Sequence, residues 1–132
     1  MNRYEAIMPG RWSERLTFSP AIRVGNLLFI SGTTATDESL KIVGIGDICE
    51  QTRQIFRKWE PILKAAGANF DNIVETTDYY TTLDGYSGTA AVRREFFRYP
   101  FPAATGVQVA GLIRAEALIE IKGVAMLDAV RS

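Results

Sequence analysis

The sequence predicts an α+β fold in which one mixed β-sheet carries two helices on one of its faces. Hydrophobic residues recur at helical spacing in two segments, near residues 47–66 and 86–98. Runs rich in β-branched and aromatic residues lie before, between and after these segments. The resulting order of strands, helix, strand, helix and two strands favours a mixed sheet with both helices packed on the same side.

The first predicted strand is largely buried and ends at Gly32. A turn at Gly25 and Asn26 precedes it, and a hydrophobic run follows the turn and stops at that glycine. This pattern is typical of a strand that enters the core of the sheet.

The first helix is predicted over residues 47–66. Asp47 suits the N-cap, and Glu50 follows three residues later, as in a capping box. Gly67 suits a left-handed helix stop. Pro61 removes one backbone donor and should bend the last turn, but the apolar periodicity outweighs that penalty.

The second half of the chain adds one helix and three strands. A Thr-, Tyr- and Val-rich stretch predicts a strand that Asp84 and Gly85 close, and a helix follows until Pro100 and Pro102 impose an extended path. The expected elements are a strand over 73–83, a helix over 86–98, and two strands over 104–113 and 117–127 joined at 114–116.

The length and composition indicate one domain spanning residues 1–132. Of the 132 residues, 47% are hydrophobic, which suits a single core of this size. Two helices on one face leave the other sheet face uncovered. Burial of that face against copies of the same chain is the simplest remedy, so a closed homo-oligomer is expected.

The charge and residue content exclude several classes of function. Fifteen basic residues balance fifteen acidic ones, so no overall field attracts nucleic acid or an anionic membrane surface. The absence of histidine and the single cysteine argue against the usual metal sites, a histidine-based triad and an internal disulfide framework. We expect no metal, no other cofactor and a small-molecule partner. No signal peptide or membrane span is visible, so a cytoplasmic location is expected.

Five segments, in this order and spacing, resemble the Rid (YjgF-type) family of small deaminases. They read FSPAIRVGN at 18–26, LFISG at 28–32, QTRQ at 51–54, AAGA at 65–68 and IEI at 119–121. The resemblance covers nearly the whole chain. It implies a chorismate-mutase-like protomer assembled as a trimeric barrel, with a ligand cleft at each subunit interface. It also implies hydrolysis of reactive enamines and imines, such as 2-aminoacrylate, to keto acids and ammonia.

Three positions of the implied cleft depart from the family pattern. Where those deaminases have Pro-Ala-Arg-Ser/Thr, with the arginine on the substrate carboxylate, this chain has Ala104 followed by Thr105. Phe18 stands where a tyrosine is frequent, and Gly106 where a cysteine is frequent, so a more apolar and roomier pocket is expected. Charge-assisted hydrogen bonds are worth about 1.5–3 kcal/mol each, so losing the arginine should weaken carboxylate binding at least tenfold.

Glu120 is the candidate catalytic residue, since it matches the family glutamate that positions the attacking water. A carboxylate there could act as general base on water and shuttle a proton to the departing amine. The alternative is an ordinary ion pair with Lys122, two residues on along the same strand face.

Further candidates for substrate binding are backbone amides and other polar side chains. The amides near Gly32 and Gly106 would let a ligand approach closely, although strand-end geometry explains both glycines as well. Thr105 could donate its hydroxyl to a ligand oxygen. Arg114 could replace the missing arginine, as could Arg23 or the second-helix arginines Arg93, Arg94 and Arg98, although exposed arginines are ordinarily just solvated.

Three functional classes follow. The first is a deaminase of an enamine, imine or amino-muconate-like metabolite other than the usual 2-imino acids, using Glu120 and water. The second is a trimeric protein that binds a ligand without turnover. The third is an RNA-directed endoribonuclease or translation inhibitor, which the zero net charge and the lack of histidine disfavour.

Overall fold

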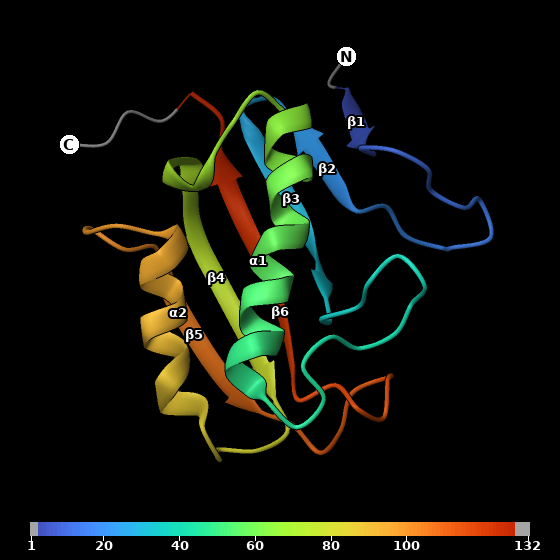
Figure 1. Ribbon diagram of the computed structural model, residues 1–132. Coiled ribbons are helices and arrows are strands. Elements are labelled where there is room, and N and C mark those ends of the chain that lie inside the picture. Colours follow the sequence, from blue (N-terminus) through green and yellow to red (C-terminus); the bar gives the residue numbers. More distant parts are fainter. Residues whose placement is uncertain (1–2, 129–132) are drawn as a thin grey trace.

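The computed structural model describes residues 3–128 as one six-stranded sheet with two helices across one face (Figure 1). The strands are β1 (Tyr4–Ile7), β2 (Ala21–Val24), β3 (Leu27–Thr33), β4 (Ile73–Tyr80), β5 (Ala103–Gln108) and β6 (Ile119–Met126). The helices are α1 (Ile48–Ala65) and α2 (Thr89–Phe96), with short 3₁₀ turns η1 (Phe70–Asn72) and η2 (Tyr86–Gly88). The predicted α+β class and the placement of both helices on one face are confirmed.

The sheet is mixed, with the order β1-β2-β3-β6-β4-β5. All neighbouring strands are antiparallel except β4 and β5, which run parallel with α2 in the connection between them. The last strand, β6, therefore lies in the middle of the sheet, between β3 and β4 (Figure 1).

Two strand predictions need correction. The strand expected over 104–113 ends at Gln108, because its partner β4 ends at Tyr80 and leaves no backbone to pair with beyond Val109. Residues 109–118 form a loop, and β5 pairs with β4 and not with β6. The sequence analysis also missed β1, which pairs with β2 at the sheet edge.

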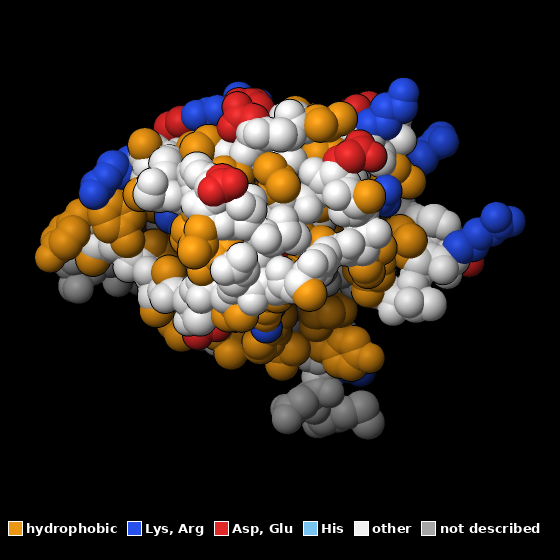
Figure 2. Space-filling view, turned by 90° about the horizontal axis from the view of Figure 1, so that it is seen from below, with side chains coloured by type: hydrophobic (Ala, Val, Ile, Leu, Met, Phe, Trp, Pro, Cys, Tyr) orange, Lys and Arg blue, Asp and Glu red, His pale blue; other side chains and the backbone are white. Residues whose placement is uncertain are grey.

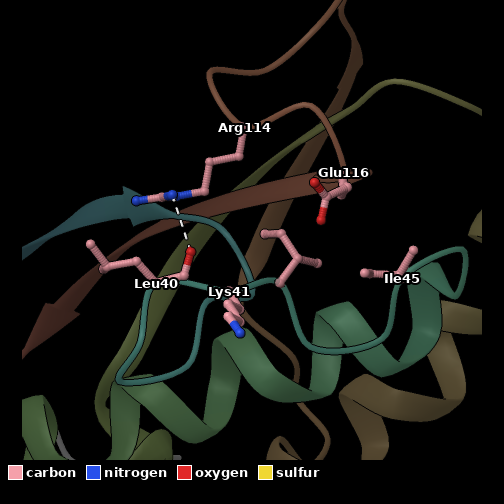
Figure 3. Close-up of a pocket in the computed structure, with 6 residues that line it drawn as sticks. Leu40, Lys41, Ile45, Arg114 and Glu116 are labelled. Atoms are coloured by element: carbon pink, nitrogen blue, oxygen red, sulfur yellow. Dashed lines mark hydrogen bonds between the residues drawn. The ribbon is translucent and has the colours of Figure 1, made fainter.

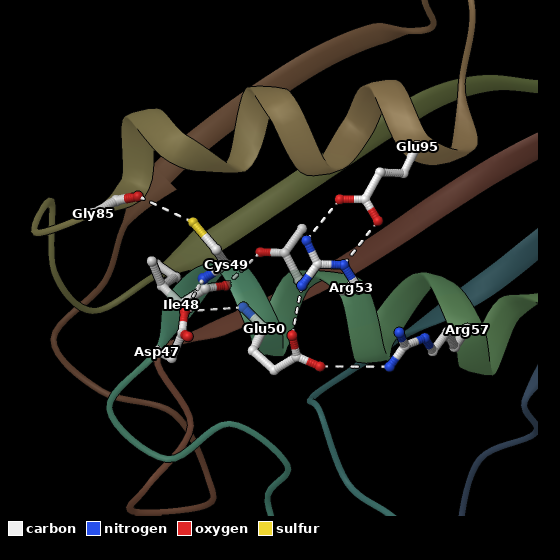
Figure 4. A network of polar contacts seen from close by, with 9 residues as sticks. Asp47, Ile48, Cys49, Glu50, Arg53, Arg57, Gly85 and Glu95 are labelled. Carbon is white, nitrogen blue, oxygen red and sulfur yellow. Dashed lines mark hydrogen bonds and ion pairs between the residues drawn. The ribbon is translucent and has the colours of Figure 1, made fainter.

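Helix α1 begins and ends as its sequence predicts, with one difference. The Asp47 carboxylate accepts from the backbone N–H groups of Cys49 and Glu50, each at 3.1 Å (Figure 4). The Glu50 side chain does not complete a capping box, because it pairs with Arg53 at 2.5 Å and Arg57 at 3.4 Å. Gly67 adopts the expected positive φ of 74° after the last turn.

The core lies between α1 and the sheet. Phe56, Trp59 and Leu63 are fully or almost fully buried on the helix face that meets β3 and β6. Gly123 of β6 is required there, since a Cβ at that position would lie 2.6 Å from the Trp59 ring. Arg53 joins the two helices through Glu95 at 2.6 Å (Figure 4).

The sheet face opposite the helices keeps hydrophobic side chains on the surface. Val24, Phe29, Val107 and Met126 occupy this face and are 41%, 45%, 41% and 37% exposed. Seen from below, the lower edge of the molecule is dominated by hydrophobic side chains, whereas charged ones gather along the upper edge (Figure 2). Among residues 3–128, no helix combines the length and the apolar character that a membrane crossing needs.

Candidate functional site

Glu120 and Gly32 are brought together on the open face of the sheet. Glu120 is half-buried at the start of β6, on the side away from the helices. A Cβ added to Gly32 would lie only 2.6 Å from Oε2 of Glu120, so the glycine lets the carboxylate lie against the backbone of β3. Any side chain at position 32 would displace the Glu120 carboxylate.

A β-bulge creates this contact. Ile30 pairs with Gly123 and Thr33 pairs with Ile121, so Ser31 and Gly32 together oppose a single residue of β6. A bulge of this kind bends the strand and re-aims a side chain, and it is frequent beside active sites. It sets Gly32 against Glu120.

The alternative considered for Glu120, an ion pair with Lys122, does not form. Lys122 is exposed and paired in register with Thr77 of β4. In the part of the chain that the structure describes, neither side chain has an ion-pair partner. Among residues 3–128, the Glu120 carboxylate therefore has no neutralising cation.

Lys58 of α1 is a polar residue at this site that the sequence analysis missed. Its Nζ donates to Oγ1 of Thr33 at 2.6 Å, to the carbonyl of Thr34 at 2.9 Å and to Oγ1 of Thr36 at 2.7 Å. Burial, and to a lesser degree the nearby charge of Arg114, lower the pKa of Lys58 to about 8. The available signal was a lysine on the buried face of an amphipathic helix, three residues after Ile55.

Ala104, Thr105 and Gly106 lie on β5, two strands from Glu120. They pair in parallel with Thr76, Thr77 and Asp78, and β4 separates them from β6. At a strand spacing of about 4.8 Å, β5 and β6 stand roughly 10 Å apart. Within one protomer these positions and Glu120 form no common site.

The room expected beside Gly106 is filled. A Cβ at Gly106 would lie 2.7 Å from the Tyr86 hydroxyl and 3.2 Å from the Tyr80 ring, and the two tyrosine rings stack at 4.1 Å. The absence of a side chain at position 106 thus accommodates Tyr86, and the prediction of a roomier pocket on this side of β5 is wrong.

Arg93 does not offer a free cation in place of the missing arginine. Its guanidinium bonds Oδ1 of Asp78 at 2.5 Å and Oγ1 of Thr76 at 3.1 Å, and the Tyr86 hydroxyl donates to Oδ2 of Asp78 at 2.8 Å. Asp78 is buried, so this network neutralises Arg93 and fixes α2 on β4. Burial first, and then the bond to Asp78, raise the pKa of Tyr86.

Phe18 and Arg114, the two remaining residues predicted to bind substrate, lie on loops. Phe18, in the loop before β2, is 52% exposed and meets Trp12 edge to face at 5.4 Å. Arg114, in the 109–118 loop, donates from Nη1 to the carbonyl of Leu40 at 3.2 Å. It lines a hollow of about 380 Å³ together with Glu116 (Figure 3). The residues from 3 to 128 contain no cluster of three or more side chains suited to hold a metal ion.

The chain is similar to known proteins over most of its length. The sequence model described as endoribonuclease L-PSP matches residues 11–127. The human 2-iminobutanoate/2-iminopropanoate deaminase is 32% identical over 109 residues, which cover 83% of this chain and 79% of that protein. The 3-aminoacrylate deaminase RutC of Acinetobacter baylyi is 32% identical over 108 residues, which cover 82% of this chain and 85% of that protein.

Solved structures agree in fold. A protein of unknown function from Pseudomonas aeruginosa has a TM-score of 0.85 at 30% identity, covering 97% of this chain and 95% of that one. A conserved Rid-family protein of unknown function from Yersinia pestis has a TM-score of 0.82 at 28% identity, covering 94% and 99%. Since the family match spans strands β2 to β6, both helices and the Glu120–Gly32 contact, the chain belongs to the Rid (YjgF) family, whose sequence model carries the description endoribonuclease L-PSP.

Proposed function

We propose that the protein hydrolyses a small enamine or imine to a carbonyl compound and ammonia, with Glu120 as the catalytic residue. The observation that carries the proposal is the Glu120 carboxylate held against Gly32, with no ion-pair partner in the part of the chain that the structure describes. The relatives named as deaminases of 2-imino acids and 3-aminoacrylate support the reaction class.

The reaction consumes one water molecule and needs one group, the Glu120 carboxyl, to transfer protons. Glu120 accepts a proton from water as the water oxygen attacks the carbon of the C=N bond, which gives a carbinolamine. The same carboxyl group returns that proton to the nitrogen to complete the carbinolamine and then carries the hydroxyl proton to the nitrogen, so the C–N bond breaks and ammonia leaves as the carbonyl forms. An enamine first takes up a proton on carbon and so enters as the imine. No cofactor takes part.

The substrate we propose is different from the usual 2-imino acids. Ala104 offers no charge at the position where the resemblance places the carboxylate-binding arginine, and the nearby Arg93 is engaged with Asp78. Phe18 adds an exposed aromatic ring. An imine without a carboxylate, or with a more apolar substituent, suits these residues better than 2-iminopropanoate does.

The complete cleft is proposed to form between copies of the chain in a homotrimer. Ala104, Thr105 and Gly106 stand roughly 10 Å from β6 within one protomer, with β4 between them. A second copy packed on the open face could bring such groups, or Phe18, close to Glu120. The half-exposed Val24, Phe29 and Met126 give that face an apolar surface to bury.

The test is ammonia release from imines generated in situ. The Glu120→Gln variant should lose at least a hundredfold in turnover, since general base catalysis commonly contributes about 10²–10⁴. Glu75→Gln is the matched control, because Glu75 is an exposed carboxylate on β4. Unchanged turnover in Glu120→Gln would remove Glu120 from the mechanism.

Substrate choice is tested with the Ala104→Arg variant. The native protein should be slow on 2-aminoacrylate-type imines, and the variant should gain at least tenfold, since one charge-assisted contact is worth about 1.5–3 kcal/mol. High native activity on these imines would show that the missing arginine does not determine the substrate.

The second candidate is a protein that binds a ligand without turnover, which the uncharged Ala104 favours. It predicts saturable binding of a carbonyl compound with no ammonia release from any imine tested. RNA cleavage is disfavoured, because the chain has zero net charge and no histidine. An RNA affinity that falls steeply with salt would revive it.

A further inference from the structure

A hollow between the segment before α1 and the 109–118 loop is lined by both charged and apolar side chains. Arg114 and Glu116 come from the loop on one side, and Leu40, Lys41 and Ile45 come from the segment facing it (Figure 3). The hollow has a volume of about 380 Å³. It therefore offers both signs of charge beside apolar side chains.

The two opposite charges on the loop do not neutralise each other. Among residues 3–128, the Arg114 side chain makes one hydrogen bond, to the neutral carbonyl of Leu40, which leaves most of the five donors of its guanidinium without a partner there. The Glu116 carboxylate has no hydrogen-bond or ion-pair partner among residues 3–128, although it lines the same hollow. A bridging molecule could satisfy both groups.

The backbone beneath Arg114 is held in a strained conformation. Leu40 has φ of 62°, a left-handed conformation that is unfavourable for a non-glycine residue and that clusters at ligand-binding sites. Asp37 holds this turn by accepting from the N–H groups of Ser39 at 2.8 Å and Lys41 at 3.0 Å. The turn presents the Leu40 carbonyl to Arg114, so one side of the hollow is fixed before any ligand arrives.

The positive charge of Arg114 affects the pKa of a nearby lysine. Lys58 is close enough that the Arg114 charge contributes to lowering its pKa, second to burial. Within the described residues, Lys58 donates only to the neutral oxygens of Thr33, Thr34 and Thr36. These two cations have no carboxylate partner in the described chain, so the local potential favours an anionic group on Arg114.

We propose that this hollow binds a small free 2-amino acid with an apolar side chain. The carboxylate would lie on Arg114, the ammonium group on Glu116, and the side chain against Ile42 and Ile45. A simple carboxylate would meet the negative charge of Glu116, and a simple amine would meet Arg114. A zwitterion is complementary to both Arg114 and Glu116, and the volume is within the usual range for small ligands. The proposal does not depend on the deaminase activity.

Calorimetric titration with L-leucine tests the site on the native protein. Leucine should bind more tightly than 4-methylpentanoate, which lacks the amine, and than 3-methylbutylamine, which lacks the carboxylate. Arg114→Gln and Glu116→Gln should each weaken leucine binding at least tenfold, the effect of losing one charge-assisted contact. Lys64→Gln and Glu60→Gln remove the same charges from exposed positions on α1 and should leave the affinity unchanged.

The nearby Lys58 gives a second readout, independent of the heat signal. In an NMR titration of lysine side chains, bound leucine should raise the pKa of Lys58, because its carboxylate neutralises Arg114. The Arg114→Gln variant should show a raised Lys58 pKa without leucine and no further change with it.

The outcomes that overturn the proposal are distinct. Absence of leucine binding to the native protein overturns it, as does equal affinity for leucine and 4-methylpentanoate, which would mean a plain carboxylate site. Undiminished binding in both Arg114→Gln and Glu116→Gln would place the ligand elsewhere. None of these results bears on ammonia release by Glu120.

Discussion

Lys58 is a charged amine held under the end of β3 by neutral oxygens alone. Its three hydrogen bonds fix the Thr33–Thr36 segment that follows Gly32, so the lysine supports the strand end against which Glu120 lies. Hydrogen bonds to a charged donor are stronger than neutral ones, but burial of that charge costs free energy. The balance between the two depends on pH.

The stability of the protein should therefore rise with pH above the Lys58 pKa of about 8. The ordinary value is 10.5, so between these two pH values the unfolded chain keeps a proton that the folded chain has released. The unfolding free energy of the native protein, relative to a Lys58→Met variant, should increase across this window by up to about 3 kcal/mol.

Chemical denaturation of both proteins, below pH 8 and again near pH 10.5, measures this difference. At each pH, the unfolding free energy of the variant is subtracted from that of the native protein. This subtraction removes the contributions from titration of the other lysines and of the tyrosines. Lys64→Met, at an exposed position of α1, should show a pH-independent difference. A constant difference for Lys58→Met as well would contradict the lowered pKa.

For individual residues, the sequence predicted which side chains are candidates for the site but not which residues they contact. Glu120 and Gly32 were singled out separately, and their meeting depends on a bulge between Ile30 and Thr33 that no local pattern encodes. Gly106 was assigned to a ligand, whereas the Tyr86 hydroxyl occupies the space beside it. Such contacts depend on residues far away in the sequence.

The two ends of helix α1 are determined by its own local sequence. Its N-cap at Asp47 and its stop at Gly67 agree with the predicted limits, because both are set by backbone groups within a few residues. Glu50 is the exception, since its carboxylate turns to Arg53 and Arg57 and does not complete a capping box.

Removal of the N-cap should destabilise the protein by about 1 kcal/mol. In Asp47→Ala the N–H groups of Cys49 and Glu50 lose their acceptor, whereas Asp47→Asn keeps a side-chain oxygen there. Urea denaturation of both variants measures the effect, and Asp47→Asn should lose less. Equal losses in the two variants would show that the hydrogen bonds at the cap contribute little.

Strand β5 shows the opposite case. Residues 109–113 have the composition of a strand, yet β5 ends at Gln108 because β4 ends at Tyr80. The length of a strand depends on its partner, and the partner was not evident from the sequence. The same loop that results carries Arg114 and Glu116 to the hollow.

The whole molecule has one sheet face covered by helices and one that keeps hydrophobic side chains exposed. The sequence predicted the covered face correctly from the order of the elements. It did not give the strand order, because hydrogen-bond partners across a sheet leave no periodic signal. The open face motivates the trimer, which stays a prediction.

Sedimentation should give a mass near three times the 14.6 kDa protomer. Phe29→Glu, which places a charge in the middle of the open face, should dissociate the assembly, since Phe29 is an apolar side chain of that face and is 45% exposed. Leu83→Glu changes an exposed apolar residue in the loop after β4 and should leave the mass unchanged. A native mass near one protomer would contradict the trimer.

The central place of β6 has a consequence for synthesis on the ribosome. Until residues 119–126 leave the exit tunnel, the β1–β2–β3 meander and the β4–α2–β5 unit have no strand between them, and β3 and β4 each present an unpaired edge. The nascent chain therefore completes its sheet only after residues 119–126 have been synthesised. A truncated chain that ends before residue 119 would leave two separate half-sheets with exposed strand edges, which are prone to aggregate.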